Sequence, residues 1–312
     1  MLNKKDYGGI ILKPGCSNSC VFCGLPEMRK TTVSSAEIRR QTVNSYKNLI
    51  DFKKQGIRNI IISGNDPLEY KRITQMIEYM KKTGFEFIQM TTNGVRLSDN
   101  YFLDRFIKSG IDKLIIPLYG SNLKIHDSVT QTPGSFIRTL KGIKGILKKA
   151  ADIKIQINSL ILQQNKDNLL DLMDLVESKL NIKDINFSIP CITNCSYYSY
   201  YIPFKDLGPY VRKIYDYALK MNYKISFIEI PYCVFGYIDR ARIDNAGLPP
   251  NLGKYCQPPK PVKTSIKDMP SYRLKRKIKM CKNCKASPFC DGFFINDIDR
   301  LFGTGDLKPL SK

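Results

Sequence analysis

The sequence predicts an α/β fold built on a parallel sheet. Short runs rich in β-branched and apolar residues alternate with longer segments in which apolar residues recur at helical spacing. Six such strands with helices between them are typical of βαβ units, whose crossover connections are right-handed. These units either close into a barrel or form an open doubly wound sheet, and the alternation alone fits both.

The predicted elements follow one another along the first 190 residues. Strands rich in β-branched and apolar residues are expected at 9–13, 59–63, 85–91, 113–117, 154–162 and 184–189. Helices are expected at about 35–55, 70–82, 99–109, 135–150 and 166–179, because their apolar residues recur every three or four positions. Each strand but the last therefore precedes one helix, which is the order of a parallel sheet.

The regular alternation ends after Pro190, and the chain then changes in character. A helical pattern runs from Pro209 to about Met221, and a further strand is expected at 224–230. From Pro231 onward Pro and Lys are frequent, no apolar period is clear, and five cysteines occur. We therefore expect two domains, residues 1–205 and residues 206–312.

Composition indicates which binding partners and which cellular compartment to expect for the chain. Its formal net charge of +22 favours acidic partners such as nucleic acid, anionic peptides or membrane headgroups, although a Lys-rich solvated surface explains the charge equally well. No secretory signal is visible, and no stretch approaches the roughly 20 apolar residues of a membrane span. We therefore expect a cytoplasmic protein, in which ten cysteines indicate metal or redox chemistry rather than disulfides.

The first group of cysteines comprises Cys16, Cys20 and Cys23, with the spacing C-x3-C-x2-C directly after the first predicted strand. Three thiolates on one loop can hold three irons of a cubane cluster, which leaves the fourth iron open to a substrate. Structural zinc sites prefer four ligands, usually in paired C-x2-C knuckles. Iron–sulfur ligation is therefore the favoured interpretation, with zinc or unligated cysteines as the alternatives.

With Phe22 directly before the third cysteine, this segment resembles the cysteine motif of the radical S-adenosylmethionine (SAM) superfamily. The resemblance covers about residues 8–200 and implies a partial (β/α)6 TIM barrel, in agreement with the strands predicted above. It implies that the open iron of a [4Fe–4S] cluster chelates the amino and carboxylate groups of SAM. One electron from the cluster would then cleave SAM to a 5′-deoxyadenosyl radical, which abstracts hydrogen from the substrate.

The loop after the second predicted strand resembles a further motif of the family. Gly64 matches the first glycine of its Gly-Gly-Glu-Pro motif, while Asn65 replaces the second glycine and Asp66 replaces the glutamate. The resemblance implies that this segment hydrogen-bonds the amino group of SAM, for which a carboxylate or a carbonyl oxygen is a suitable acceptor. An ordinary turn with Asp before Pro is the alternative.

Further polar residues follow the later strands. Asn93 lies in Thr91-Thr92-Asn93-Gly94, which resembles the family's T-x-N-G and is expected to shape the barrel mouth without direct chemistry. By the same resemblance Ser121 contacts the carboxylate or the ribose of SAM, and Asn158 contacts its ribose. His126 is the single histidine of the chain, and a lone histidine more often packs or caps a helix than performs catalysis. No catalytic residue is therefore assigned.

A second group of cysteines lies near the C-terminus. Cys281, Cys284 and Cys290 have the spacing C-x2-C-x5-C-x-G, which resembles the SPASM and twitch extensions of radical SAM maturases. That resemblance implies an auxiliary [4Fe–4S] cluster, and one cluster fits better than two because no cysteine follows Cys290. We favour Cys233 as the fourth ligand because it directly follows a predicted strand, with Cys256 as its alternative.

Two further interpretations of the cysteines stay open. Four thiolates near the C-terminus would also suit a structural zinc ion. Cys191 and Cys195 follow the sixth predicted strand, where they could be redox-active, donate protons to a substrate radical, or simply pack.

The sequence therefore predicts a radical SAM enzyme, and its extension indicates a maturase that acts on a peptide or protein. The expected partners are SAM, the peptide substrate and an electron donor such as a flavodoxin or ferredoxin. A radical SAM enzyme acting on nucleic acid or on a small-molecule precursor is the first alternative. A scaffold that binds zinc or iron–sulfur without catalysis is the second, because Asn65 and Asp66 depart from the family motif.

Overall fold

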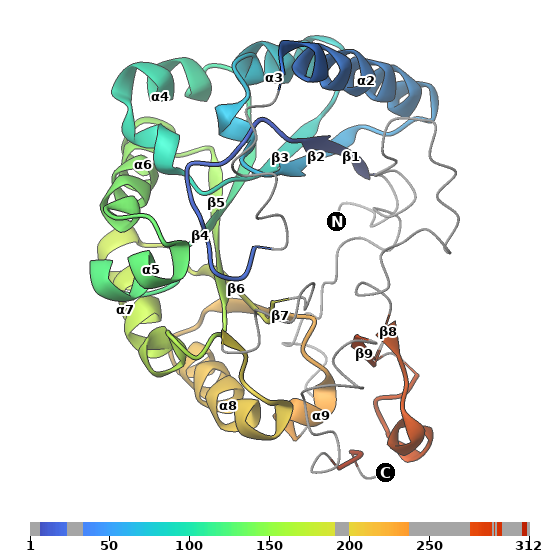
Figure 1. Ribbon diagram of the computed structural model, residues 1–312, viewed down its shortest axis with the longest axis vertical. Helices are drawn as coiled ribbons and strands as arrows, with labels where there is room; N and C mark the ends of the chain where they lie inside the picture. The colour runs from blue at the N-terminus through green and yellow to red at the C-terminus, as the bar shows by residue number, and fades with distance from the viewer. Residues whose placement is uncertain are drawn as a thin grey trace. The chain divides into compact units, whose positions relative to one another are not determined.

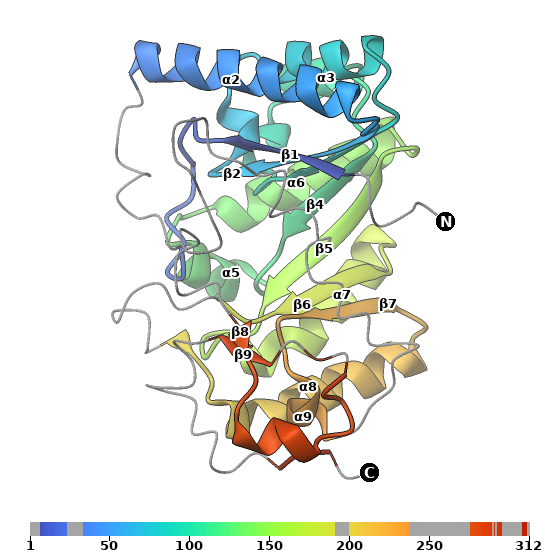
Figure 2. The ribbon, with the colours of Figure 1, turned by 90° about the vertical axis from the view of Figure 1, so that its right-hand side faces the viewer.

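The computed structural model describes residues 7–23, 34–190, 200–236, 275–288, 290, 292–294 and 308–310. Their α/β fold contains a sheet whose seven strands are hydrogen-bonded in chain order, β1 to β7 (Figures 1 and 2). The described residues fall into two compact units. Residues up to 118 and 122–157 form the first unit, and residues 119–121 and those after 157 form the second. No helix among the described residues is long and apolar enough to cross a membrane.

The sheet of the first unit is parallel, with its strands paired in chain order. It comprises β1 (Tyr7–Leu12), β2 (Asn59–Gly64), β3 (Phe87–Thr91) and β4 (Lys113–Pro117). In β2 the consecutive residues Ile60, Ile61 and Ile62 are all buried, as expected of a parallel strand that is covered on both faces. The register pairs Leu12 with Gly64, so the chain leaves β1 and β2 side by side.

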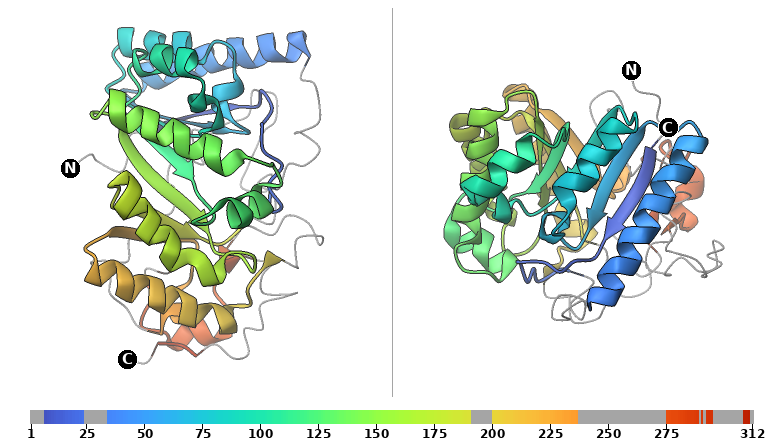
Figure 3. Two further views of the ribbon diagram at one scale, coloured as in Figure 1. Left: turned by 90° about the vertical axis from the view of Figure 1, so that its left-hand side faces the viewer. Right: turned by 90° about the horizontal axis from the view of Figure 1, so that it is seen from above.

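Helices follow the strands of the first unit, and some of them begin at polar side-chain caps. They are α2 (Ser35–Lys54), α3 (Ile73–Lys82), α4 (Asn100–Ile107), α5 (Leu123–Thr130) and α6 (Ser135–Lys149). Ser34, Asp99 and Asn122 accept hydrogen bonds from backbone N–H groups in the first turns of α2, α4 and α5. Figure 3 shows α2 running beside β1, where the Phe52 ring covers Gly8 so closely that a Cβ there would lie 2.5 Å from it.

The second unit continues the sheet, since β5 (Lys154–Leu160) begins in the first unit and ends in the second. It also contains α7 (Leu169–Leu180), β6 (Asp184–Ser188), α8 (Phe204–Lys220), β7 (Lys224–Ile228) and α9 (Tyr232–Phe235). A small antiparallel pair joins β8 (Lys275–Arg276) to β9 (Phe293–Phe294). Strands β6 and β7 are parallel, and Phe187, Phe227 and Phe235 pack in succession from β6 to α9, with ring centroids 6.1 and 4.9 Å apart.

The predicted fold class is confirmed, and each predicted strand is present. The third strand begins at Phe87 rather than Phe85, because the backbone N–H of Phe85 bonds the carbonyl of Met80 and closes the end of α3. Helix α8 begins at Phe204, five residues before Pro209, so the proline lies inside the helix instead of starting it. The short helices α5 and α9 were not predicted. The domain boundary near residue 205 stays a prediction.

Gly64 offers a direct test of the β1–β2 register. Its φ is +138°, and a Cβ there would lie 1.7 Å from the carbonyl oxygen of Leu12. Gly84 also has a positive φ of +93°, but a Cβ there meets no atom within 4 Å. Gly84→Ala should therefore lower the free energy of unfolding by only about 1–2 kcal/mol, the cost of left-handed backbone. Gly64→Ala should cost at least about 3 kcal/mol, because β1 must also move.

Urea unfolding of both variants measures this difference. Equal losses in the two variants would show that β1 and β2 are not paired as described.

Candidate functional site

The loop that carries the first cysteines is held by the end of α5. Backbone N–H groups of Ser19 and Val21 donate to the carbonyls of Thr130 and Val129, each at 2.9 Å. Within the loop, the backbone N–H of Cys23 donates to the carbonyl of Cys20 at 3.1 Å. The loop after β1 is thus fixed by a helix more than 100 residues further along the chain.

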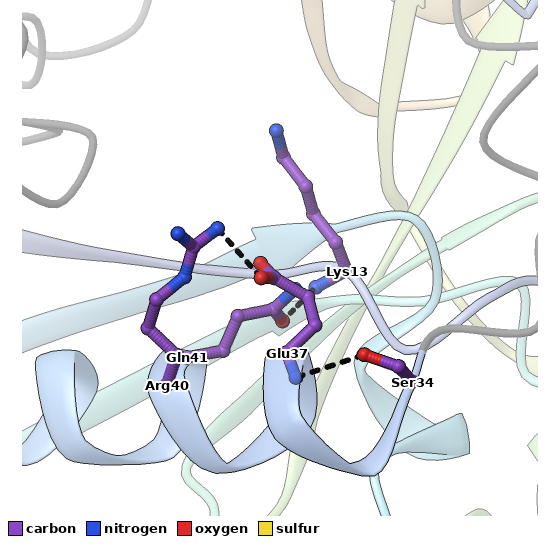
Figure 4. A network of polar contacts seen from close by, with 5 residues as sticks. All are labelled: Lys13, Ser34, Glu37, Arg40 and Gln41. Atoms are coloured by element: carbon purple, nitrogen blue, oxygen red, sulfur yellow. Dashed lines mark hydrogen bonds and ion pairs between the residues drawn. The ribbon is translucent and has the colours of Figure 1, made fainter.

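The entry to this loop is fixed by α2 (Figure 4). The backbone N–H of Lys13 donates to Gln41 Oε1 at 3.1 Å, and Gln41 Nε2 donates to Glu37 Oε1 at 3.3 Å. Glu37 also pairs with Arg40 at 2.6 Å, and its backbone N–H donates to the capping Ser34 hydroxyl. The side chain of Lys13 points away from this network in Figure 4. The chain is therefore anchored three residues before Cys16.

Cys16 receives two N–H donors. The backbone N–H of Asn18 lies 3.4 Å from its sulfur, and Asn93 Nδ2 lies 3.5 Å from it. Asn93 Nδ2 also donates to Ser17 Oγ at 3.0 Å, while its Oδ1 accepts from the N–H of Val95 at 2.8 Å. Because Oδ1 already has a donor, the amide nitrogen must face the cysteine loop. Asn93 therefore contacts a predicted metal ligand, although its motif was expected only to shape the barrel mouth.

The surroundings of Cys16 disfavour the ionised form of its thiol. Burial raises the pKa of its thiol to about 11, with a smaller contribution from the nearby Asp66 carboxylate. The N–H donors of Asn18 and Asn93 act in the opposite direction. A bound cation would remove the proton from such a thiol, since metals bind cysteine as the thiolate.

The turn after β2 lies against the cysteine loop. The backbone N–H of Asn65 donates to the carbonyl of Leu12 at 3.1 Å, and that of Asp66 donates to the carbonyl of Gly15 at 3.0 Å. The close approach requires glycine at position 64, as the contact with Leu12 shows. Predicted residues Gly64, Asn65 and Asp66 are thus brought directly beside the predicted cysteine ligands.

Asp66 is fully buried, and among the described residues only one of its two carboxylate oxygens has hydrogen-bond donors. Its Oδ1 accepts from Thr92 Oγ1 at 2.5 Å and from the N–H of Leu68 at 3.2 Å. Its Oδ2 is buried without a hydrogen-bond partner in the described part of the chain. Burial raises the pKa of this carboxyl to about 7, against the lowering effect of the Thr92 hydroxyl. One oxygen therefore stands ready to accept a donor from a ligand.

The residues around the single histidine are structural. His126 is buried, its ring packs 5.5 Å from that of Phe136, and burial lowers its pKa to about 4. The adjacent Asp127 accepts from the N–H of Gly134 at 2.6 Å, from Ser135 Oγ at 2.7 Å and from the N–H of Phe136 at 2.9 Å. This short stretch therefore joins α5 to the start of α6.

Ser121 and Asn158 belong to the second unit. The backbone N–H of Ser121 donates to Asn168 Oδ1 at 2.7 Å, and Asn168 Nδ2 donates to Ser121 Oγ at 2.9 Å. Asn158 is half-buried on β5. The nearby Asn165 links the ends of β4 and β5, since it donates to the carbonyls of Tyr119 and Leu160 and accepts from the N–H of Leu162. Neither Asn165 nor Asn168 was predicted, because such partners lie far apart in sequence.

The four predicted C-terminal ligands lie together in the second unit. Cys233, Cys281, Cys284 and Cys290 line one enclosed cavity of about 10 Å³. Burial raises the pKa of the Cys233 thiol to about 12, and the three other cysteines raise it further by their proximity. Backbone bonds from Cys284 to Cys281 and from Ser287 to Cys284 form the turns between them. Cys233 follows β7 by way of Pro231, as the sequence predicted.

No disulfide bond joins any of the seven cysteines in the described ranges. Within the described ranges, no three His, Cys, Asp or Glu side chains already form a group suited to a single metal ion. Cys191, Cys195 and the alternative ligand Cys256 lie outside the described residues.

The buried carboxyl of Asp66 should make stability depend on pH. Its pKa is raised in the folded chain, so the native state binds this proton more tightly than the unfolded state does. The free energy of unfolding should therefore fall as the pH rises from about 4 to about 7. Asp66→Asn should flatten this slope, whereas Asp104→Asn on the exposed side of α4 should keep it. Urea unfolding across this range measures the slope, and an unchanged slope in Asp66→Asn would contradict the assignment.

Comparison with known proteins identifies the family. The model of the radical SAM superfamily matches residues 10–176, which is more than half of the chain. An AdoMet-dependent heme synthase of Methanosarcina barkeri is 29% identical over 167 residues, 53% of this chain and 45% of that protein. A GTP 3′,8-cyclase of Petrotoga mobilis is 26% identical over 171 residues, 53% of this chain and 50% of that protein. The chain spans about half the length of these curated relatives.

Solved structures share the fold. Streptococcus suis SuiB bound to its precursor peptide SuiA has a TM-score of 0.54 at 18% identity, covering 71% of this chain and 48% of SuiB. The enzyme anSMEcpe with bound AdoMet and a peptide has a TM-score of 0.54 at 12% identity, covering 70% of this chain and 63% of that chain. The core predicted from the cysteine motif is confirmed, while the cluster-binding extension stays a prediction. The chain belongs to the radical SAM superfamily.

Proposed function

We propose that this chain cleaves SAM reductively at a [4Fe–4S] cluster and abstracts hydrogen from a peptide or protein substrate. Enzymes of its superfamily use these two cofactors. The observation that carries the proposal is the junction of two loops in the first unit. The loop of Cys16, Cys20 and Cys23 is hydrogen-bonded to the turn of Asp66 through the carbonyl of Gly15.

The cysteine loop suits the cluster. Its three thiols lie on one loop that is anchored by α2 at its start and by α5 at its end. Asn93 and the backbone of Asn18 direct N–H groups at the sulfur of Cys16, and such bonds to ligand sulfurs help set the reduction potential of iron–sulfur centres. When bound, the cluster supplies the electron that releases the 5′-deoxyadenosyl radical from SAM.

The turn after β2 suits the amino group of SAM. Among the described residues the buried Oδ2 of Asp66 has no hydrogen-bond donor, and a buried acceptor without a donor is destabilising until a ligand supplies one. Thr92 and the N–H of Leu68 hold the carboxylate in place. The proposed contacts of Phe22, Ser121 and Asn158 with SAM remain part of the proposal and rest on the family resemblance.

We assign the auxiliary site to Cys233, Cys281, Cys284 and Cys290. All four cysteines line one cavity, and this supports a metal centre with four thiolate ligands, although the described side chains would have to move closer together to bind one metal group. A [4Fe–4S] cluster is the proposed occupant, and a structural zinc ion is the alternative.

A peptide substrate is favoured over two other classes. SuiB and anSMEcpe, which share the fold, bind peptides according to their structures. A small-molecule precursor is the second candidate, because the curated relatives are named for heme and GTP chemistry. A nucleic-acid substrate is supported only by the net charge of +22.

Release of 5′-deoxyadenosine tests the proposed reaction. The anaerobically reconstituted chain, reduced in the presence of SAM, should form 5′-deoxyadenosine. Cys20→Ala should abolish this release, because two thiolates are too few to hold an open-iron cubane. Ser19→Ala, which alters an exposed side chain of the same loop, should keep the rate of the parent. Continued release by Cys20→Ala at that rate would refute the proposed cluster.

Elemental analysis tests the auxiliary site. A variant with Cys16, Cys20 and Cys23 all changed to Ala should retain about four irons if the C-terminal cysteines hold a cubane. The zinc alternative predicts about one zinc and no iron in that variant. Adding Cys233→Ala should reduce metal retention, whereas adding Cys256→Ala should not. Full retention after Cys233→Ala would show that the fourth ligand was wrongly assigned.

A further inference from the structure

A second and larger cavity of the second unit adjoins the group of four cysteines. It lies between the start of α8, the end of α9 and residues 308–310, and its volume is about 440 Å³. Cavities of this size are typical of small-molecule sites. Three cations line it, namely Lys205, Arg212 and Lys308, and none of its described lining residues is acidic. We call it the cationic cavity.

A hydrogen bond within the protein holds the guanidinium of Arg212 in the cationic cavity without any bound ligand. Its Nη1 donates to the carbonyl of Phe235 at 3.2 Å. The guanidinium lies beside two glycines, since a Cβ on Gly208 would be 3.1 Å and one on Gly236 3.6 Å from Nη1. Gly208 also allows α8 to approach α9, because a Cβ there would lie 2.7 Å from the carbonyl of Val234. A side chain at position 208 would press on the guanidinium, whereas a Cβ at position 236 would only touch it.

The remaining donors of Arg212 suit a carboxylate. A guanidinium has five N–H donors in a planar fork, and a carboxylate accepts two of them in parallel. Arg212 uses one donor for the carbonyl of Phe235, and Lys308 adds positive charge to the lining of the cavity. A carboxylate is opposite in charge to this lining, and a cavity of about 440 Å³ has room for an acidic side chain.

The cationic cavity is joined to the proposed auxiliary centre. Cys233 lines both cavities. Residues 308–310 are held by a bond from the N–H of Lys285 to the carbonyl of Leu310 at 3.1 Å, and Lys285 directly follows Cys284. A ligand in the cationic cavity would therefore lie next to the cysteine group.

We propose that the cationic cavity binds an acidic side chain of the peptide substrate through the guanidinium of Arg212. This inference rests on the proposed peptide substrate and adds the residue type that the enzyme recognises. The net charge of +22 would steer such a peptide to the protein, and the fork of Arg212 would select the carboxylate.

Fluorescence anisotropy with the full chain, purified anaerobically, tests the proposal. The probe is a labelled Gly-Glu-Glu-Glu-Gly peptide, with Gly-Gln-Gln-Gln-Gly as its neutral match. Arg212→Lys keeps the charge but removes the fork, and should weaken binding of the acidic peptide by about ten- to a hundred-fold. Lys308→Gln should weaken it several-fold. Lys213→Gln, which removes the same charge from the exposed side of α8 outside the cavity, should have little effect.

The results separate specific binding from attraction by net charge. Equal losses in Lys308→Gln and Lys213→Gln with none in Arg212→Lys, or equal binding of the two peptides, would overturn the inference. Binding of a labelled oligothymidylate that falls with Arg212→Lys as much as peptide binding does would overturn it too, because the cavity would then not select carboxylates. Free glutarate should compete only weakly if the peptide is the true ligand, and competition as strong as that of the peptide would oppose the proposal. The assay needs no radical chemistry, so absence of 5′-deoxyadenosine would count against the proposed function alone.

Discussion

The pairing of β1 with β2 is the constraint on which the first site depends. Leu12 lies opposite Gly64 in the parallel register, and its carbonyl occupies the space that a side chain at position 64 would need. The two loops that leave these strands are therefore in contact from their first residues, and Asp66 reaches the carbonyl of Gly15. Parallel strands gather polar loops at their carboxyl ends, which is where α/β folds place ligands.

Hydrogen bonds from residues distant in sequence then connect the cysteine loop and the turn of Asp66 to a third strand. Asn93 from the end of β3 contacts the sulfur of Cys16, and Thr92 beside it contacts the carboxylate of Asp66. Two neighbouring residues thus join the cysteine loop and the acidic turn to a third strand. These bonds hold the two loops together, and within the described part of the chain they leave the Oδ2 of Asp66 without a donor. Preorganised acceptors of this kind bind a ligand at little cost in conformational entropy.

Much of this arrangement could be predicted from the sequence, because it depends on local spacing. The strand pattern identified the α/β fold, and the cysteine spacing identified the superfamily and placed Gly64 and Asp66 near the cysteines. The roles of Asn93 and Asp127 could not be predicted, because each depends on partners that only the folded chain brings close. The position of Cys233 in the same cavity as the later cysteines was predicted from its place after a strand. The cationic cavity was not predicted, since Gly208 on α8 and Gly236 after α9 lie beside the same guanidinium only in the folded chain.

The loop of Cys16, Cys20 and Cys23 is proposed to hold a cluster whose open iron lies beside the turn of Asp66. Electron paramagnetic resonance of the reduced chain tests it most directly, using the variant that lacks the four C-terminal cysteines so that only the first cluster contributes. The reduced variant should give a [4Fe–4S] signal whose g values shift when SAM is added, and this shift should be smaller at equal SAM concentration in Asp66→Asn. A signal that SAM leaves unchanged would contradict this proposal.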